Sequence, residues 1–248
     1  MSLFSSNKST KSESNGSNNK EVKSEESWHG LLRRSFLRNF LYNDETVYVQ
    51  MANIRRSGDI ALHSIQFLDF LEDDPQYLIF QLAVNNNSLM GDLKACAKAE
   101  LCWNMPKSKE HFYLSGRFYI ASAPIQVTRY PPPRIRPEID AASYWEELRL
   151  RQWRRLNPQM RSTYTWPPSG ETPRANQAYA CLSLDAIADD SPQDARRIIH
   201  DIALDNFCLL VFKVLGVTHF NYSTFPPTRT VYTLNQEKGK WESLESNP

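Results

Sequence analysis

The C-terminal part of the chain constrains the fold more than any other segment. Residues 207–214 (FCLLVFKV) form an apolar run, which is typical of a strand that is buried on both faces. We expect a short turn at Leu215 and Gly216, followed by three more strands, at residues 217–222, 229–232 and 240–244. A buried strand followed by short strands predicts the end of a β-barrel, with Arg229 as a cation at the head of its last hairpin.

The chain has 248 residues and a formal net charge of +1. This length is ample for one domain with a hydrophobic core and a polar tail. A nearly neutral chain has no overall field that attracts nucleic acid or anionic lipid, and its longest apolar run is too short to cross a bilayer. We therefore expect no nucleic-acid partner and no membrane insertion.

The cysteines indicate a reducing compartment. Cys96, Cys102, Cys181 and Cys208 show no Cys-x-x-Cys spacing, which is typical of reduced thiols. A zinc site needs at least one close pair of ligands, so we expect no metal. Because the N-terminus also has no secretory apolar segment, we expect a protein of the cytoplasm or the nucleus.

Composition divides the chain into a tail and one domain. Residues 1–26 are mostly Ser, Asn, Lys and Glu. Such a segment cannot bury enough apolar surface to offset the entropy of ordering it. We therefore expect a disordered tail at residues 1–26 and a single domain at residues 27–248.

Apolar residues after the tail follow helical and then strand periodicity. Trp28, Leu32 and Phe36 lie at helical spacing and predict a helix over about residues 25–41. The period then changes to two, which predicts strands near residues 47–51, 60–70, 77–84, 101–105 and 112–121. Strands repeated at such short spacing favour a barrel over a layered α/β fold.

A short helix that opens at residues 85–88 (NNNS) and ends near Lys98 is expected after the third strand. Two further helices are expected later in the chain. Ser143 and Glu146 form a capping box that predicts the start of the first one, and Ser191 is expected to begin the second. The first helix is rich in arginines, which we expect on its solvent-exposed face: Arg149, Arg151, Arg154 and Arg155.

Five segments, in the same order along the chain, resemble the pyridoxamine 5′-phosphate oxidase-like FMN-binding split barrels. They are residues 60–70, 77–93, 101–116, 145–170 (which include RSTYTWPPSG) and the C-terminal strands with Arg229. The resemblance implies a mainly β fold with flanking helices, a split barrel of the FMN-binding type that forms a homodimer. It also implies FMN as the cofactor, bound between subunits, and an FMN-dependent oxidoreductase activity related to that of the oxidases.

The resemblance also implies the residues that contact the flavin. One subunit would contribute eight of them: His63, Ser64, Gln66, Asn86, Asn87, Ser88, His111 and Arg229. The second subunit would contribute three: Arg161, Trp166 and Ser169. Other roles stay open, because a lone histidine in a strand is more often a packed core residue and a run of asparagines is typical of a turn.

The chain departs from the family pattern where cations normally hold the flavin phosphate. His63 and Leu68 stand at positions that are basic in the family, and His111 stands in place of a glutamine near the flavin ring. Charge-assisted hydrogen bonds to phosphate are about twice as strong as neutral ones, so FMN binding is expected to be weakened. The family's Arg-x-His substrate element is also missing before Arg229, which leaves the substrate open.

Two alternative functions follow from these departures and from the arginine-rich helix. The first is a degenerate split-barrel dimer that has lost the flavin and serves as a binding or scaffold protein. The second is docking to nucleic acid or another partner through the basic helix at residues 149–155 and the lysine-bearing tail, which the net charge disfavours. The sequence has no motif of a phosphate-binding loop, a serine hydrolase or a zinc protease. A flavin enzyme nevertheless needs few protein acid–base groups, because the cofactor carries the hydride chemistry.

Overall fold

The computed structural model describes residues 27–41, 46–128, 130–168, 182–185, 195–235 and 237–248. The expected tail lies outside these residues, and the single domain at residues 27–248 stays a prediction. The strands are β1 (Tyr48–Ile54), β2 (Ile60–Phe70), β3 (Tyr77–Ala83), β4 (Lys98–Met105), β5 (Glu110–Ala121), β6 (Phe207–Asn221), β7 (Thr228–Asn235) and β8 (Lys240–Ser246). The helices are α1 (Trp28–Phe40), α2 (Asn87–Ala95), α3 (Ala141–Arg155), α4 (Pro158–Ser162) and α5 (Ala195–Asn206), with a 3-10 turn η1 (Thr163–Thr165).

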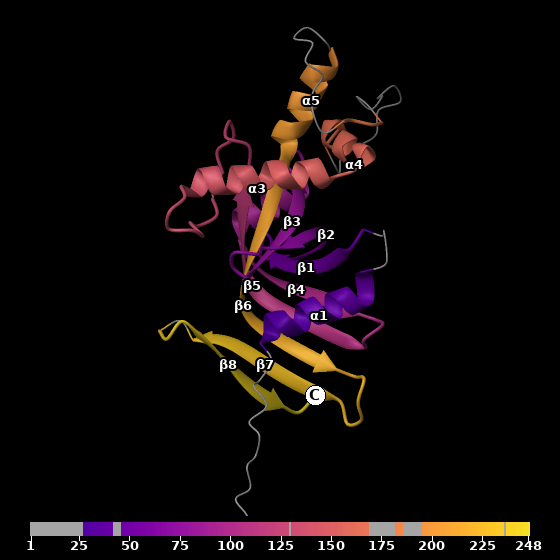
Figure 1. Cartoon of the computed structure of the whole chain (residues 1–248), viewed down its shortest axis with the longest axis vertical. Coiled ribbons are helices and arrows are strands. Elements are labelled where there is room, and N and C mark those ends of the chain that lie inside the picture. The colour runs from indigo at the N-terminus through magenta and orange to yellow at the C-terminus, as the bar shows by residue number, and fades with distance from the viewer. Residues whose placement is uncertain (1–26, 42–45, 129, 169–181, 186–194, 236) are drawn as a thin grey trace, which may run out of the picture.

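Strands β1 to β6 close into a barrel (Figure 1). Their order is β3-β2-β1-β4-β5-β6, and β6 pairs with β3 to close the cycle. β7 and β8 extend the sheet from β6 as a hairpin, while α3, α4 and α5 gather at the other end of the molecule (Figure 1). The expected mainly β split barrel with flanking helices is confirmed.

Two hydrophobic cores explain why the sequence of β6 is so apolar. Cys208, Leu210 and Phe212 point into the barrel and join the first core. Leu209 and Val211 point the opposite way, into a second core between the outer wall of the barrel and the helices. The prediction of a strand buried on both faces is therefore confirmed for the start of β6.

The expected turn at Leu215 and Gly216 is wrong, because β6 continues without a break to Asn221. In the pairing with β5, Ser115 lies opposite Gly216 but Gly116 lies opposite Val214. Leu215 is therefore the extra residue of a β-bulge, a feature that a glycine next to an apolar run does not distinguish from a turn.

Helix α3 begins earlier than the capping box predicts. Asp140 is its N-cap, with the carboxylate accepting a hydrogen bond from the backbone N–H of Ser143 at 3.1 Å. The capping box of Ser143 and Glu146 is therefore wrong, because an acidic cap three residues upstream already satisfies that N–H. The expected start of the last helix at Ser191 lies outside the described residues, and α5 is described from Ala195.

The expectation that the α3 arginines face solvent is wrong for Arg149, whose exposed fraction is 2%. Its guanidinium pairs with the Glu146 carboxylate at 2.8 Å and donates to the carbonyl oxygens of Leu204 and Phe207. These carbonyls lie where α5 passes into β6. The buried Arg149 side chain of α3 therefore supplies hydrogen-bond donors to carbonyl oxygens at the C-terminal end of α5. The neighbouring Arg151, Arg154 and Arg155 are exposed, as expected.

Candidate functional site

The outer face of the barrel collects the side chains that alternate outward along its strands. On β5 these are His111, Tyr113 and Ser115, whereas Phe112 and Leu114 are buried in the barrel. Strand pairing places His111 beside Phe220 of β6, and Phe220 beside Arg229 of β7. The register therefore brings together two predicted site residues, His111 and Arg229, that are more than a hundred positions apart in sequence.

A cluster of aromatic rings lies on this face, and one of the rings contacts the predicted cation. The Tyr113 and Phe220 ring centroids are 5.5 Å apart, and the His111 and Tyr222 centroids are 5.3 Å apart. Phe220 and Tyr222 lie almost parallel, with an angle of 8° between their planes. The Arg229 guanidinium lies 5.3 Å from the centre of the Phe220 ring, a cation–π arrangement. Tyr113 and His111 instead meet Phe220 and Tyr222 edge-on, at interplanar angles of 83° and 64°. These contacts build an aromatic cluster with one positive charge at its edge.

A groove runs along this outer face in two parts, which we call the arginine lobe and the apolar lobe. The arginine lobe has a volume of about 460 Å³ and is lined by residues that include Tyr113, Thr218, Phe220 and Arg229. The apolar lobe has a volume of about 670 Å³ and is lined by residues that include Ile54, Ile60, Lys98 and Arg117. Glu100, Ser115 and Leu215 line both lobes, where the two lobes meet. Both volumes lie in the range of small-molecule sites.

The groove contains hydrogen-bond donors without partners. The Nε atoms of Arg229 and Arg117 are buried and have no hydrogen-bond partner among the described residues. Arg229 lines the arginine lobe and Arg117 lines the apolar lobe. A buried donor without a partner is costly, so this groove fits a ligand that has acceptor atoms and a planar body. FMN has both features.

The predicted residues of β2 divide between two faces of the strand. Ser64 and Gln66 alternate outward with the exposed Leu62, and the Ser64 hydroxyl donates to the Gln50 side chain at 2.9 Å. His63 points the other way, and its Nε2 lies 2.9 Å from the Asp92 carboxylate of α2. Ser64 and Gln66 thus share the outer face with His111 and Arg229, whereas His63 does not.

The asparagine run opens α2 as a capped helix start. Asn86 is the N-cap, and its side-chain oxygen accepts from the Leu89 N–H at 3.2 Å. Asn87 and Ser88 form the first turn of the helix. The charged groups next to this segment include Asp92, which contacts His63 and lies 3.6 Å from the Arg55 guanidinium. A carboxylate already paired with both basic groups makes this region a poor fit for a flavin phosphate.

The predicted second-subunit residues lie on the helical side of the molecule. Arg161 is buried and donates to the carbonyl oxygens of Leu184 and Leu156 in its own chain. Trp166 follows η1, and its carbonyl oxygen accepts from the Asn85 side chain at 2.9 Å. Ser169 lies outside the described residues. Neither Arg161 nor Trp166 lines the groove of its own chain.

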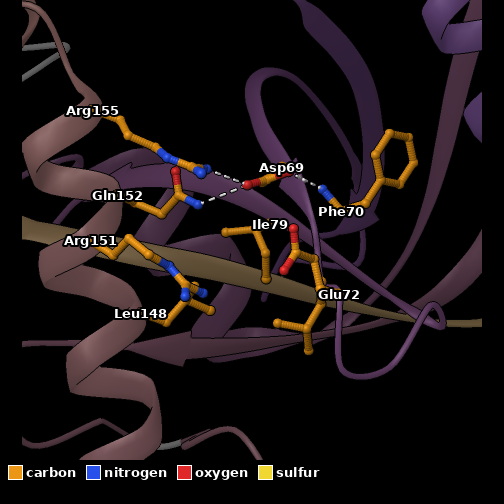
Figure 2. A pocket seen from close by; sticks show the side chains of 9 residues that line it. Asp69, Phe70, Glu72, Ile79, Leu148, Arg151, Gln152 and Arg155 are labelled. Atoms are coloured by element: carbon orange, nitrogen blue, oxygen red, sulfur yellow. Dashed lines mark hydrogen bonds and ion pairs between the residues drawn. The ribbon is translucent and has the colours of Figure 1, made fainter.

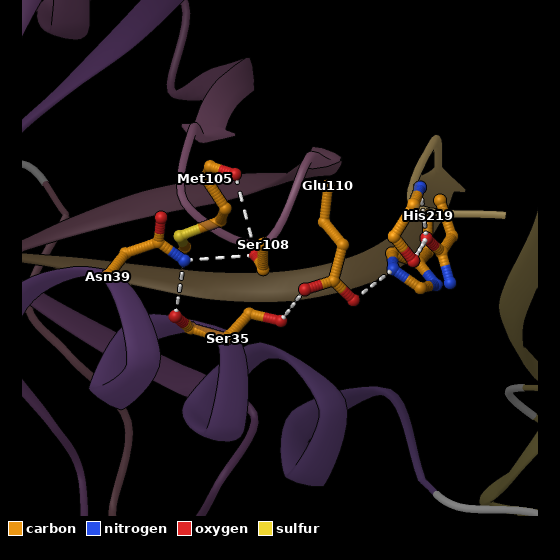
Figure 3. A network of polar contacts seen from close by, with 8 residues as sticks. Ser35, Asn39, Met105, Ser108, Glu110 and His219 are labelled. Carbon is orange, nitrogen blue, oxygen red and sulfur yellow. Dashed lines mark hydrogen bonds and ion pairs between the residues drawn. The ribbon is translucent and has the colours of Figure 1, made fainter.

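A second polar cluster lies inside the barrel and ties α1 to the strands (Figure 3). Glu110 accepts hydrogen bonds from Ser35 of α1 and from His219 of β6, the latter at 3.0 Å. Burial alone would raise the pKa of Glu110, but the hydrogen bonds from His219, Ser108 and Ser35 outweigh it and lower the pKa to about 2. The carboxylate lies between the serine and the histidine, so this order does not make a nucleophile and its base. The cluster has a structural role, because it joins α1 to β5 and β6.

A small polar pocket lies between β2 and α3 (Figure 2). Asp69 accepts a hydrogen bond from Gln152 at 3.1 Å and pairs with Arg155 at 2.6 Å. The pocket has a volume of only about 40 Å³, which is room for water and not for a cofactor. Asp69 and Arg155 already pair with each other, and the small volume leaves the outer groove as the candidate site.

Two other classes of site are absent from the described part of the chain. Among those residues, no group of three His, Cys, Asp or Glu side chains is arranged to hold a metal ion. None of the described helices is long and apolar enough to span a bilayer.

Several groove residues were missed by the sequence analysis. Tyr113 and Phe220 could have been found, because alternation along a strand places Tyr113 on the same face as His111. Lys98 and Arg117 left no signal in the sequence, because only the strand register brings these two groove residues side by side.

Comparisons with known proteins support the fold. No protein-family model matches the sequence, and no curated protein sequence matches it. A pyridoxamine 5′-phosphate oxidase-related, FMN-binding protein from Nostoc punctiforme PCC 73102 has a similar structure, with a TM-score of 0.68 and 24% identity over 90% of this chain and 98% of that one. PhzG from Burkholderia lata 383, in complex with tetrahydrophenazine-1-carboxylic acid, matches with a TM-score of 0.55 and 13% identity over 88% of this chain and 91% of that one. The chain therefore has the split-barrel fold of the pyridoxamine 5′-phosphate oxidase-related FMN-binding proteins.

Proposed function

We propose that this protein binds FMN in the outer groove of the barrel. The observation that carries the proposal is Arg229, a groove cation with an unpaired buried Nε that lies against the Phe220 ring. A structural neighbour with the same fold is described as FMN binding. The proposal therefore rests on a donor and an aromatic surface of this chain, in a fold that accommodates flavin elsewhere.

The residues of the arginine lobe define what this chain would do for the cofactor. Tyr113 and Phe220 would contact the flat faces or edges of the flavin ring, and Arg229 would donate to an acceptor atom of the ligand. When bound, FMN supplies hydride-transfer chemistry. We infer an FMN-dependent oxidoreductase in the cytoplasm, with its substrate open.

We further propose that two copies of the chain cover the groove together. The outer face exposes large apolar side chains, including Ile60 (77% exposed), Leu62 (70%) and Leu244 (69%). An apolar patch on a sheet face marks an interaction surface, and homodimers are the commonest assembly of soluble proteins. In such a dimer the loop that carries Trp166 would approach the groove of the partner.

A titration tests the FMN proposal. The purified protein is examined by visible absorbance and then titrated with FMN by fluorescence, in the wild type, in Arg229→Ala and in Arg56→Ala. Arg56 is an exposed cation in the β1–β2 turn and serves as the control. Loss of a charge-assisted hydrogen bond should weaken FMN binding about tenfold or more in Arg229→Ala. Equal affinity of the two variants for FMN would show that Arg229 does not contribute to FMN binding.

One observation favours the alternative function, a dimeric scaffold that has lost the flavin. The family's phosphate-holding positions carry Leu68 and a His63 that is paired with Asp92. If the wild type shows no flavin absorbance and no FMN binding, the cofactor has been lost and the dimeric scaffold function stands. Light scattering then decides whether the groove is an interface between two copies.

A further inference from the structure

Three basic residues form a row across the outer face of the barrel. Lys98 of β4 lies directly opposite Arg117 of β5, and Arg117 lies directly opposite Lys213 of β6. Residues directly opposite one another in antiparallel strands project to the same side of the sheet, and neighbouring strands lie about 4.8 Å apart. The three side chains therefore leave the sheet at neighbouring positions on one face, although they are far apart in sequence. We call Lys98, Arg117 and Lys213 the cationic row.

This arrangement works against stability. Like charges directly opposite each other on a sheet are destabilising, and the cationic row has two such pairs. No ion pair within 4.0 Å joins these side chains to an acidic residue in the described part of the chain. Glu100 lines the same lobe of the groove but makes no ion pair with them. A row of unneutralised cations is expected where an anion binds.

The chain holds two of these cations in fixed positions. The Arg117 guanidinium lies 5.1 Å from the centre of the Tyr119 ring, and the Lys213 ammonium lies 5.6 Å from the centre of the Tyr77 ring. Tyr77 is a core residue, so its ring is a rigid support. The Nε of Arg117 is buried without a partner. The donors are thus oriented before any ligand arrives, which lowers the entropic cost of binding.

The cationic row lies where the groove meets the helix-covered wall. Lys98 and Arg117 line the apolar lobe, and Lys213 follows Leu209 and Val211, which are covered by the helices. The apolar lobe adjoins the arginine lobe through Glu100, Ser115 and Leu215. A single elongated ligand in the groove would therefore have a cation available at each end.

We infer that the cationic row is the phosphate anchor of the ligand in this groove, with Arg117 as its central donor. Arginine binds phosphate through two parallel hydrogen bonds, and lysines neutralise the remaining charge. This inference rests on the proposed FMN function and extends it, because it moves the phosphate away from the His63 and Asn86 region. It leaves Arg229 at the ring end of the ligand. The cations missing from β2 and α2 are then replaced by residues of three other strands.

The test compares FMN with riboflavin, which lacks the phosphate. Dissociation constants of both ligands are measured for the wild type, Arg117→Gln, Arg229→Ala and the control Lys240→Gln, an exposed lysine of β8. Arg117→Gln should weaken FMN binding about tenfold and leave riboflavin binding unchanged. Arg229→Ala should weaken both ligands. Thermal unfolding of Arg117→Gln should occur at the wild-type temperature or above it, because a like-charge contact is removed.

Other outcomes separate this inference from the proposed function. If the wild type binds both flavins and Arg117→Gln weakens both or neither, the phosphate anchor is wrong while FMN binding stands. If the wild type binds neither flavin, the FMN proposal fails, and the cationic row is tested alone by calorimetry with inorganic phosphate and pyrophosphate. Binding that is lost in Arg117→Gln but kept in Lys240→Gln supports an anchor for another phosphorylated ligand. Absence of binding overturns the inference.

Discussion

The Nε2 atom of His219 lies 3.0 Å from the Glu110 carboxylate inside the barrel, and both side chains are more than nine-tenths buried. Their strands, β5 and β6, also carry His111 and Phe220, which point outward into or beside the groove. The same carboxylate binds Ser35 of α1. One buried acid therefore connects α1 to the two strands that form the centre of the candidate site.

Replacing Glu110 with glutamine should change the pH dependence of stability. Its pKa is lowered from 4.5 to about 2, so the carboxylate stabilises the fold above pH 4.5, and this contribution is lost as the pH falls from 4.5 to 2. The shift corresponds to about 3 kcal/mol. Glu110→Gln should therefore unfold at lower urea concentration at pH 7 and approach the wild type near pH 2.

Urea titrations at pH 7, 4 and 3 measure this difference. Glu245→Gln, at an exposed position of β8, is the matched control. A constant gap between Glu110→Gln and the wild type at all three pH values would show that the carboxylate is not the titrating group.

Replacing glycine with alanine should have opposite effects on stability at two positions, one beside the β-bulge and one in α2. A Cβ on Gly116 would lie 2.2 Å from the Lys213 carbonyl oxygen and 2.7 Å from the Phe212 ring, whereas a Cβ on Gly91 in α2 meets nothing within 4 Å. Gly116→Ala should destabilise the protein by about 1–3 kcal/mol. Gly91→Ala should stabilise it by up to about 1 kcal/mol, because alanine favours a helix. Equal unfolding midpoints would contradict the close approach of β5 and β6.

Arg149 should matter for stability far more than its neighbour Arg154. Arg149→Met leaves the carbonyls of Leu204 and Phe207 and the Glu146 carboxylate without their donor. Breaking such a buried set costs about 3 kcal/mol. Arg154→Met, on the exposed side of α3, should change the free energy of unfolding by less than about 0.5 kcal/mol. Denaturant titration of both variants measures the two free energies of unfolding. Equal values would contradict a stabilising contact between α3 and α5 through Arg149.

Cysteine labelling should distinguish the buried thiol from the accessible ones. Burial raises the pKa of Cys208 to about 12, and the residue lies in the first core. Cys96 and Cys102 are partly exposed. Because the thiolate is the reactive species, a maleimide at pH 7.5 should label Cys96 and Cys102 in the native protein, and Cys208 only after unfolding. Peptide mass spectrometry identifies the labelled positions, and rapid native labelling of Cys208 would contradict its placement.

The strand pattern of this chain could be predicted from the sequence because it is a local property. Alternation with period two identified β1 and β2, and the apolar run at Phe207 identified a strand buried on both faces. His111 and Arg229 were predicted as site residues from a resemblance, and the structure places them on one face. Two predicted boundaries were wrong. At Ser143 the choice lay between two possible N-caps, and at Leu215 it lay between a turn and a β-bulge; in both places the surrounding structure decides.

Only the tertiary structure decided which distant residues meet. Strand register places Lys98, Arg117 and Lys213 in one row and separates His63 from Ser64, because a shift of one residue moves a side chain to the other face of the sheet. The pairing of Glu110 with His219, and of Arg149 with the end of α5, likewise depends on contacts between segments far apart in sequence. The sequence by itself determined the elements and their apolar faces, since these depend on neighbours along the chain. The site depends on closure of the barrel, which sets the register of every strand at once.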